Sequence, residues 1–323
     1  MSRHARQIAL LGEAAQARLA RAHVLVVGAG GLAAPVLAYL VGAGLGRITL
    51  MDGDRVSLSN LHRQVLFRSG DIGQPKARLA AAQMAALNPD CEVLAMTEPL
   101  DPLNAADHVA AADLVLDCAD SFAASYILSD TCLAQGKPLI SASVVGLSGY
   151  VGGFCGGAPS LRAVFPDLPD RLGSCAEDGV LGPSVGVIGS LQAQMALAVL
   201  AGMEPSPLGQ LVTFEATGHR FGGFRFDGAP EPAGGFGFIA PAQIAPGDWL
   251  VDLRAEGEAG PVLPHATRRS VPDFDTIRPE GARAVLACRS GLRAWQAAAR
   301  LRAHWEGEIA LIALGGPEEE ATP

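Results

Sequence analysis

The stretch His23-Val-Leu-Val-Val-Gly28-Ala-Gly-Gly31 decides the fold class. A short apolar run ends here in a cluster of glycines, and the uncharged run 32–43 that follows has the length of a helix. This order predicts a buried strand, a tight turn and a buried helix. Free backbone N–H groups at the start of such a helix favour an anion, so the turn suits a phosphate.

The uncharged stretch 24–46 is also long enough to resemble a membrane span. Glycines at turn spacing and Pro35 interrupt it, so we interpret it as part of a globular core. Charged residues break up the first 21 positions, which is unlike a cleavable signal peptide. Six cysteines without a C-x-x-C pair are typical of a reducing compartment. We therefore expect a cytoplasmic protein.

The same alternation of strands and helices continues to about residue 142. A second strand is predicted at 47–51, and it stops at Asp52. Further strands are predicted at 92–96, 113–117 and 138–142, with helices at 5–21, 74–87 and 122–135. This order predicts an α/β fold with a doubly wound, mostly parallel, Rossmann-like sheet, on which ligands bind at the carboxyl ends of the strands.

Length and composition indicate two globular domains. The chain has 323 residues, of which 49% are hydrophobic and 18% charged, as in a folded protein with an aliphatic core. The segment 227–237 (DGAPEPAGGFG) is rich in glycine and proline, so we predict domains at 1–226 and 238–323 with this linker between them. The formal charge of −9 argues against nucleic-acid and anionic-membrane partners.

Polar residues after the second strand indicate which nucleotide is bound. Asp52 follows Gly28 by 24 residues, at a position where a carboxylate commonly binds a ribose. Arg63 and Lys76 follow within the next segment. A dinucleotide needs few cations, whereas a triphosphate undergoing displacement needs them as charge builds on the leaving pyrophosphate. The pattern favours a triphosphate; the alternative is that both cations are solvated surface residues.

Asp120 lies after the strand predicted at 113–117, on the same edge of the sheet. Beside phosphates its carboxylate is suited to Mg²⁺, which takes carboxylate and phosphate oxygens. Its alternative role is to cap the helix that begins near Phe122.

Seven segments together resemble the ubiquitin-activating-like adenylyltransferases of the HesA, MoeB and ThiF type, over residues 1–226. In chain order they are Arg3-x-x-Arg6-Gln7-Ile8, Gly28-x-Gly30-Gly31-Leu32, Asp52-x-Asp54, Ser59-Asn60-Leu61-x-Arg63-Gln64, Gln74-Pro75-Lys76, Asp117-Cys118-x-Asp120 and Gly186-Val-Ile-Gly189-Ser190. The family includes the bacterial molybdopterin-synthase and thiamine-pathway enzymes.

The resemblance implies a role for each matching residue. ATP is expected at Gly28, Gly30, Gly31, Asp52 and Asp54, with the ribose on Asp52. The phosphates are expected at Asn60, Arg63, Gln64 and Lys76. Arg6 is expected to reach the site of the other subunit of a homodimer, and Asp120 to bind Mg²⁺. The partner implied is a ubiquitin-like sulfur-carrier protein ending in Gly-Gly, whose terminal carboxylate attacks the α-phosphorus of ATP.

The chain departs from this family at the zinc-binding cysteines and in the segment after Asp120, whereas Cys175 matches a family position. Ser160-Leu-Arg-Ala163 stands where the first zinc-binding C-x-x-C pair usually falls, and the second pair is missing, so we predict no structural zinc. Ser121 and Ser125 replace the usual Asn and Arg, which puts Mg²⁺ or phosphate binding in doubt. Cys175 aligns with a cysteine that some relatives use as an acyl or sulfur acceptor; its alternative is a buried structural cysteine.

The C-terminal segment resembles a rhodanese domain. Trp249-Leu-Val-Asp252-Leu-Arg254 is similar to its strand and acidic loop, and Ala284-Val-Leu-Ala-Cys288-Arg-Ser-Gly291-Leu-Arg293 to its active-site loop. Cys288 is expected at the start of the helix 294–301, where a lowered thiol pKa and an anionic persulfide are favoured. The domain looks trimmed, so an active sulfurtransferase and a docking module both stay open. Catalytic candidates are therefore Arg63, Lys76, Asp120, Cys175 and Cys288.

Three other functions stay open. An NAD-dependent oxidoreductase explains the glycines and Asp52 but leaves Arg63, Lys76 and Cys288 without a role. A non-catalytic regulator that binds carrier proteins is suggested by Ser121 and Ser125. Adenylation of a modified tRNA base is disfavoured by the acidic charge and the sulfur-transfer segment. The sequence does not choose between the molybdopterin, thiamine and other sulfur-carrier pathways.

Overall fold

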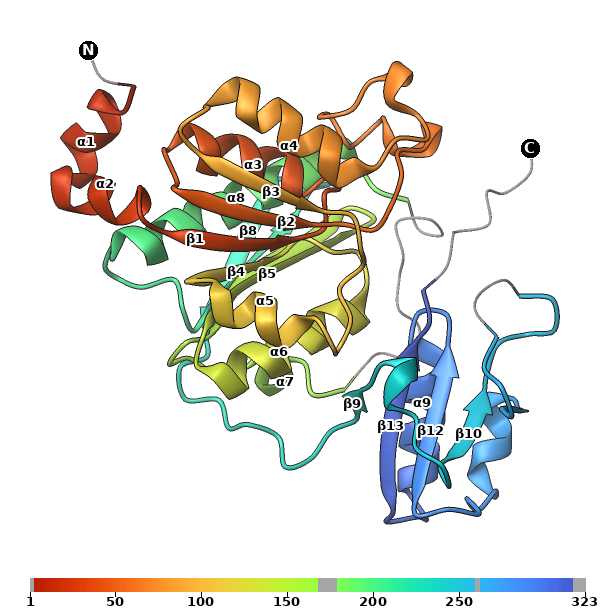
Figure 1. Ribbon diagram of the computed structural model, residues 1–323. Coiled ribbons are helices and arrows are strands. Elements are labelled where there is room, and N and C mark those ends of the chain that lie inside the picture. The colour runs from red at the N-terminus through yellow and green to blue at the C-terminus, as the bar shows by residue number, and fades with distance from the viewer. Residues whose placement is uncertain (1–2, 168–178, 259–261, 316–323) are drawn as a thin grey trace.

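The computed structural model describes residues 3–167, 179–258 and 262–315. Figure 1 shows a larger α/β unit, which contains an eight-stranded sheet, and a smaller unit beside it. The larger sheet has the order β3-β2-β1-β4-β5-β6-β7-β8. Its strands are β1 (His23–Val27), β2 (Arg47–Met51), β3 (Glu92–Met96), β4 (Leu114–Asp117), β5 (Pro138–Val145), β6 (Ser148–Cys155), β7 (Gln210–Glu215) and β8 (Arg220–Arg225).

The first five strands of this order are parallel, and β6, β7 and β8 continue the sheet antiparallel. The predicted doubly wound, mostly parallel sheet is therefore confirmed. The last predicted strand continues three residues beyond its expected end at 142, because β5 forms a hairpin with β6 through Gly146, whose φ is +59°.

Helices cover both faces of the larger sheet (Figure 1). They are α1 (Ala5–Leu11), α2 (Glu13–Leu19), α3 (Ala33–Gly42), α4 (Lys76–Leu87), α5 (Ala105–Ala111), α6 (Phe122–Gln135), α7 (Leu161–Val164) and α8 (Gly182–Ala201), with 3-10 turns at Leu58–Asn60 and Ser69–Asp71. Alternate residues of β1 point to the two faces: Val24 and Val26 pack with α3, α4 and α8, whereas Leu25 and Val27 pack with α5 and α6.

The single helix predicted at 5–21 is wrong. Two helices meet at Gly12, whose φ of +81° a helix interior does not allow. The first of them, α1, has no fully buried residue, and Leu10 is largely exposed. Spacing of apolar residues alone did not reveal this break.

Among the described residues, α8 is the one helix long and apolar enough to cross a membrane. It packs instead against α3, β5 and β6 within the core. Gly189 makes this approach possible, because a Cβ there would lie 2.5 Å from the carbonyl oxygen of Leu32. The stretch 24–46 likewise forms β1, a turn and α3, as predicted.

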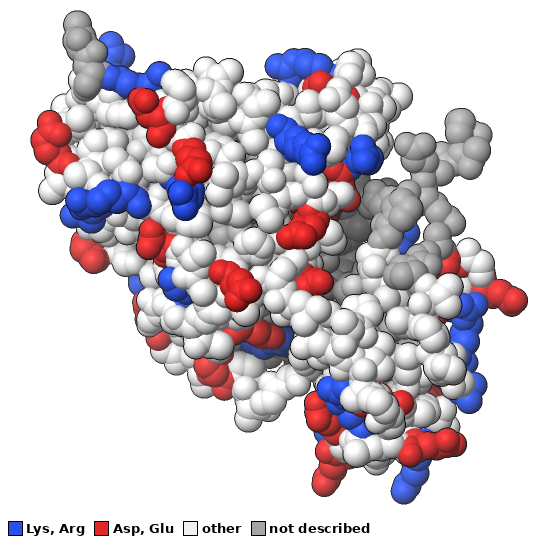
Figure 2. All heavy atoms as spheres, viewed as in Figure 1, with Lys and Arg blue, Asp and Glu red and all other residues white. Residues whose placement is uncertain are grey.

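The smaller unit is a five-stranded parallel sheet with the order β11-β10-β12-β13-β9. Its elements are β9 (Gly237–Phe238), β10 (Trp249–Asp252), β11 (Thr267–Arg268), β12 (Arg283–Cys288), α9 (Leu292–Arg302) and β13 (Glu308–Ala313), with 3-10 turns at Pro241–Gln243 and Val271–Asp275. The strands and the helix predicted around Cys288 are confirmed. Over the face shown in Figure 2, acidic and basic side chains are interspersed on both units.

Candidate active site

The glycine turn connects β1 to α3 at the carboxyl end of the sheet. Gly28 has a φ of +95°, and a Cβ at this position would lie 2.6 Å from the carbonyl oxygen of Cys118, just past β4. The backbone N–H groups of Gly30 and Gly31 donate to no partner among the described residues. The turn therefore offers two free donors at the start of a helix, where an anion is favoured.

Gly28→Ala is expected to destabilise the protein by at least about 2 kcal/mol, because alanine is strained at positive φ and its Cβ meets Cys118. Gly30→Ala is the matched control, since its Cβ would make only an ordinary contact, 3.5 Å from the Gln64 side chain. We expect the control to lose less than about 1 kcal/mol. Urea denaturation of both variants measures this; equal losses would contradict the turn geometry.

Asp52 lies directly after β2 and beside the glycine turn. Its carboxylate accepts hydrogen bonds from the N–H of Ala29 at 2.6 Å and from the N–H of Asp54 at 2.7 Å. Burial raises the pKa of this carboxyl group, and the Lys76 charge opposes the effect. The structure thus places Asp52 within reach of a ligand held on the glycine turn, as the ribose assignment requires.

Lys76 is the first residue of α4, and only 6% of it is exposed. Its Nζ donates to the carboxylate of Asp54 at 2.9 Å, and that carboxylate is exposed. The alternative that Lys76 is a solvated surface residue is therefore wrong. A buried ammonium group is costly unless it is paired, and the Asp54 carboxylate pairs this one.

Arg63 lies on the loop that follows the 3-10 turn Leu58–Asn60. Its guanidinium group donates to the carbonyl oxygen of Ser59 at 3.1 Å and contacts the His62 ring at 2.8 Å. The backbone of Arg63 faces the glycine turn: a Cβ at Gly31 would lie 3.2 Å from its carbonyl oxygen. The side chain holds only local contacts and is half-buried, so it is free to turn toward a ligand.

Asn60 and Gln64 are both buried beside this loop. The Asn60 side chain accepts a hydrogen bond from the Ser57 N–H and so shapes the turn. The Gln64 amide lies against Gly30, and its Oε1 has no partner among the described residues. The structure therefore brings Asn60, Arg63 and Gln64 together on one side of the glycine turn.

Asp120 is exposed at the carboxyl end of β4, two residues before α6 begins. Within the described part of the chain, no group donates a hydrogen bond to it. Ser121, the N-cap residue of α6, makes no side-chain capping bond. The capping role considered for Asp120 is therefore wrong, and within the described ranges neither of its carboxylate oxygens has a hydrogen-bond partner.

Asp117 is a site residue whose burial the sequence did not reveal. It ends β4, is fully buried, and accepts a hydrogen bond from the Ser141 hydroxyl at 2.7 Å. Burial raises its pKa to about 6, and hydrogen bonds from Ser125, Ser141 and Ala119 oppose this. Gln192 donates to the Asp117 carbonyl oxygen at 2.7 Å. A glutamine inside the apolar helix α8 was the available signal.

Replacing Asp117 with asparagine is expected to change how stability depends on pH. A folded pKa near 6 exceeds the unfolded value, so the folded state binds more protons, and wild-type stability falls as pH rises from 4 to 7. Relative to Asp117→Asn, the wild type should lose about 2.4 kcal/mol across this range. Urea denaturation of both proteins at pH 4 and pH 7 measures their unfolding free energies. If the difference between the two proteins were the same at both pH values, Asp117 would stay ionised in the folded state.

Cys288 lies at the carboxyl end of β12 and is fully buried. Its Sγ accepts a hydrogen bond from the Gly291 N–H at 3.1 Å. The lowered thiol pKa expected from the sequence is wrong: burial raises the pKa, and the N–H of Ala294 and the charge of Arg293 offset it only in part. The N-terminus of α9 lies beside the sulfur and lowers the thiol pKa, but the removal of water from around the thiol raises the pKa by more.

Two ion pairs surround the Cys288 loop. Arg293 donates to Glu258 at 2.5 Å. The pKa of the Arg293 guanidinium group is raised, and Cys288 contributes to this shift. Arg254 and Asp252 form a buried pair at 2.9 Å, at the end of β10. The two segments that resemble a rhodanese domain are joined instead by the parallel pairing of β10 with β12 and by the Leu253 N–H, which donates to the Ala287 carbonyl oxygen at 2.8 Å.

A model of the ThiF family matches residues 2–232, well over half of the chain. The chain belongs to the ThiF family. The resemblance to ubiquitin-activating-like adenylyltransferases is thereby confirmed. A relative of this ThiF-family chain in Thermus thermophilus, named sulfur carrier protein adenylyltransferase, is 42% identical over 226 residues, which cover 67% of this chain and 83% of the relative.

Other relatives of this ThiF-family protein are longer. The adenylyltransferase and sulfurtransferase MOCS3 of Sus scrofa is 43% identical over 219 residues, which cover 66% of this chain and 48% of that protein. The chain thus spans about half the length of such relatives. Among solved structures, E. coli MccB shares the fold, with a TM-score of 0.65 at 20% identity over 71% of this chain and 74% of that chain.

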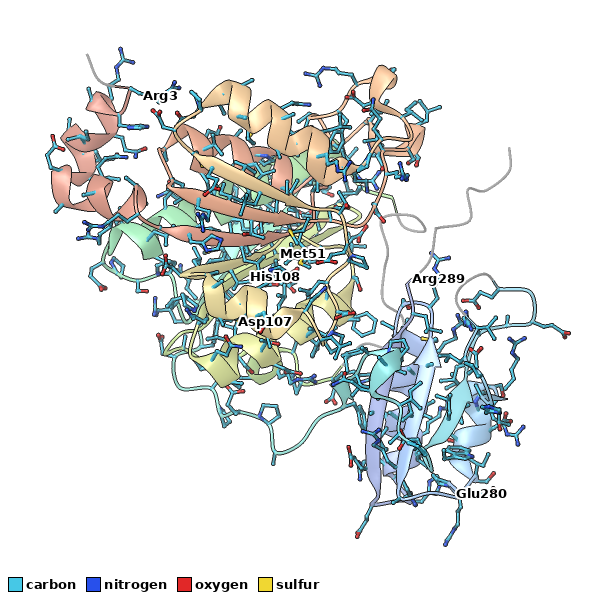
Figure 3. The ribbon with its side chains drawn as sticks, in the orientation of Figure 1. Arg3, Met51, Asp107, His108, Glu280 and Arg289 are labelled. Carbon is cyan, nitrogen blue, oxygen red and sulfur yellow. The ribbon has the colours of Figure 1, made fainter. Side chains whose placement is uncertain are left out.

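Arg6, which the ThiF resemblance also picks out, lies apart from the glycine turn. Arg6 is exposed on α1, which lies near the amino end of β2, because its neighbour Gln7 donates to the Ala43 carbonyl oxygen at 2.9 Å. In Figure 3, Arg3 beside α1 and Met51 at the end of β2 lie well apart. Cys175 lies outside the described residues.

The segment that stands in place of the first zinc pair is held by polar contacts. The N–H and the hydroxyl group of Ser160 donate hydrogen bonds to the Glu231 carboxylate, at 2.7 and 2.5 Å. Arg162 donates twice to Asp130, at 2.6 and 2.8 Å. Among the described residues, no three His, Cys, Asp or Glu side chains form a group that could hold a metal.

Proposed function

We propose that the protein uses ATP to adenylate the C-terminal glycine carboxylate of a ubiquitin-like sulfur-carrier protein. The observation that carries the proposal is the position of Lys76: a buried cation at the edge of the sheet that also holds Asp52 and the glycine turn. The backbone of Arg63 lies beside the same turn, and its side chain is proposed to supply a second cation there. Relatives named as adenylyltransferases, one of them of a sulfur carrier, support the assignment.

Each residue has a role that follows from its position. Asp52 accepts hydrogen bonds from the ribose, and the free N–H groups of Gly30 and Gly31 bind a phosphate. Arg63 and Lys76 stabilise the charge that develops on the leaving pyrophosphate. Asn60 and Gln64 complete the cradle, with the unpaired Gln64 Oε1 facing a ligand or its water.

The reaction needs positioning more than proton transfer. The carrier carboxylate is already ionised at neutral pH, so it attacks the α-phosphorus without a general base. A new P–O bond forms to the carboxylate, the bond to the β-phosphate oxygen breaks, and pyrophosphate leaves. Lys76, and Arg63 once its guanidinium group has turned toward the phosphates, favour this step because they stabilise the charge of the transition state.

Asp120 fits the Mg²⁺ that the family implies. Its exposed carboxylate has no competing donor among the described residues, whereas the neighbouring Asp117 is buried and hydrogen-bonded to Ser141. Mg²⁺ commonly takes one or two carboxylates together with phosphate oxygens and water. When bound, the ion neutralises phosphate charge; Asp120 orients it. Ser121 and Ser125 leave this carboxylate as the main protein ligand.

We infer that the active protein is a homodimer. A depression of about 390 Å³ lies between α1, α3 and α8, and the half-exposed side chain of Tyr39 lines it. Gln7 and Ser190 lie on its polar wall. A second copy packed here covers the exposed side of α8 and brings its α1, which carries Arg6, toward the neighbouring nucleotide site.

The C-terminal unit is proposed to deliver sulfur to the adenylate. A persulfide on Cys288, loaded from a sulfane-sulfur donor such as thiosulfate, attacks the acyl carbon; the bond to the phosphate oxygen breaks and AMP leaves. A reducing thiol then cleaves the S–S bond, which releases the carrier thiocarboxylate and leaves a mixed disulfide on Cys288. Arg293 and the Gly291 N–H are placed to hold the anionic sulfur.

The partner is expected to be a carrier protein in the cytoplasm rather than a nucleic acid or a membrane. The net charge of −9 disfavours polyanions. Two of the alternatives give different results in solution. A non-catalytic regulator would bind the carrier protein but show no carrier-dependent ATP–pyrophosphate exchange, whereas an NAD-dependent oxidoreductase would bind NADH. Fluorescence titration with NADH and ATP separates the latter.

Mass spectrometry of a Gly-Gly-ended carrier tests the function. Incubation with the protein, ATP and Mg²⁺ should give the carrier adenylate, and addition of thiosulfate and a thiol should give the thiocarboxylate. A carrier truncated by its last two residues is the control and should stay unmodified. If the intact carrier gains no adenylate, the proposed activity is wrong.

A further inference from the structure

Arg162 forms a junction between the two units of the chain. It is the second residue of α7, and only 8% of it is exposed. Besides its paired contacts with Asp130, its Nη2 donates to the carbonyl oxygen of Phe236 at 3.0 Å. Phe236 lies in the linker segment, just before β9. One side chain therefore connects α6, α7 and the linker.

Aromatic rings from both units surround this guanidinium group. Its Cζ lies 4.6 Å from the ring centroid of Tyr126, on α6, and 5.4 Å from that of Trp295, on α9. The Tyr126 and Trp295 rings are 5.2 Å apart, and Phe236 packs edge-on against Trp295 at 5.3 Å. A guanidinium group over aromatic faces is a favourable, directional contact, stronger when it is desolvated.

A second contact extends this junction to the Cys288 loop. A Cβ at Gly291 would lie 2.8 Å from the Phe238 ring and 3.2 Å from the Phe122 ring. Phe122 begins α6 two residues after Asp120, and Gly291 donates to the Cys288 sulfur. In Figure 3, Arg289 lies at the end of β12 that faces the larger unit, whereas Glu280 lies at the opposite end.

The linker is fixed as well. Glu231, in the middle of the linker, binds both the N–H and the hydroxyl of Ser160. Ser160 and Arg162 belong to the segment where the resembling family carries its first zinc-binding pair. The residues that replace that pair thus hold the linker and the C-terminal unit.

We infer that Arg162 is a positioning residue: it locks the C-terminal unit so that the Cys288 loop stays beside the Asp120 edge of the same chain, and sulfur passes within one chain. The inference rests on the proposed function. Holding two reacting groups together replaces an encounter in solution with a high effective concentration. Arg162 touches neither ATP nor sulfur, so its removal should affect only the coupled step.

Three assays on full-length Arg162→Gln test the inference. Carrier-dependent exchange of pyrophosphate into ATP reports adenylation. Thiosulfate-to-cyanide transfer reports Cys288, which takes sulfur as sulfite leaves and gives it up as thiocyanate. We expect both to stay within about twofold of wild type, while thiocarboxylate formation from carrier, ATP and thiosulfate falls at least about tenfold as the effective concentration is lost.

Phe236→Ala, which removes the linker ring that packs against Trp295, should show the same pattern if Arg162→Gln does not fold. Arg225→Gln is the matched control: Arg225 also binds an aspartate twice, but on exposed β8, and all three rates should be unchanged. Unaltered thiocarboxylate formation in both junction variants would overturn the inference, as would an equal fall in all three assays.

A failure of the proposed function looks different. If the wild type shows no exchange, adenylation is refuted, and small-angle X-ray scattering still tests the junction. Arg162→Gln should then have a larger radius of gyration than wild type and Arg225→Gln. An identical radius in all three proteins would show that Arg162 does not hold the units together.

Discussion

Replacing Arg63 with alanine is expected to lower carrier-dependent ATP–pyrophosphate exchange by at least about 100-fold, as removal of one preorganised charge-stabilising donor commonly does. Among the residues that the structure describes, its guanidinium group contacts only Ser59 and His62, so its removal should leave the fold intact. The unfolding free energy should change by less than about 0.5 kcal/mol. The measurement is exchange of labelled pyrophosphate, with urea denaturation alongside it.

Arg68→Ala is the matched control for this experiment. Arg68 lies five residues further along the same segment, and within the described residues its guanidinium group donates to the backbone carbonyl groups of Val65 and Phe67. It should retain wild-type exchange. Unchanged turnover in Arg63→Ala, with a normal fold, would mean that Arg63 does not contact the phosphates.

Cys288→Ser is expected to abolish thiocarboxylate formation, with a fall of at least about 1000-fold, because a hydroxyl group cannot carry a persulfide. Adenylation should be unchanged, since Cys288 lies in the smaller unit. Cys91→Ala is the control: Cys91 is also buried, with a thiol pKa raised to about 11, but it lies beside α4 in the larger unit. Both reactions should survive in this control.

The pH dependence of sulfur loading provides a further readout for Cys288. Burial raises its thiol pKa, and the thiolate is the nucleophile, so wild-type loading from thiosulfate should accelerate as pH rises from 7 to 9. A rate independent of pH would indicate a thiol that is already ionised. Thiocarboxylate made by Cys288→Ser would show that sulfur enters by another route.

The nucleotide half of the molecule was largely predictable because its signals are local. An apolar run, a glycine turn and an apolar helix impose β1 and α3 by pattern alone, and the carboxyl ends of β1, β2 and β4 must then meet at one edge. This is why the predicted Gly28, Asp52 and Asp120 lie on that edge. The Lys76 contact with Asp54 follows from the same placement.

Other features depend on tertiary contacts that no local pattern carries. The break at Gly12 separates two segments whose apolar spacing reads as one helix. The thiol pKa of Cys288 reflects how deeply β12 is buried, and the helix start alone predicts the opposite direction. Arg162 contacts Asp130, Tyr126 and Trp295 only when both units are folded. The sequence of the segment 160–163, which drew notice for its missing cysteines, therefore did not indicate this role.

The most direct test of the central claim is a crystal structure with a non-hydrolysable ATP analogue and Mg²⁺. The claim predicts phosphates on the Gly30 and Gly31 N–H groups, with the Arg63 guanidinium group turned from Ser59 toward them and the Lys76 ammonium group at hydrogen-bonding distance. The ribose should lie on Asp52. Phosphates bound elsewhere, with Arg63 and Lys76 in their present contacts, would contradict it.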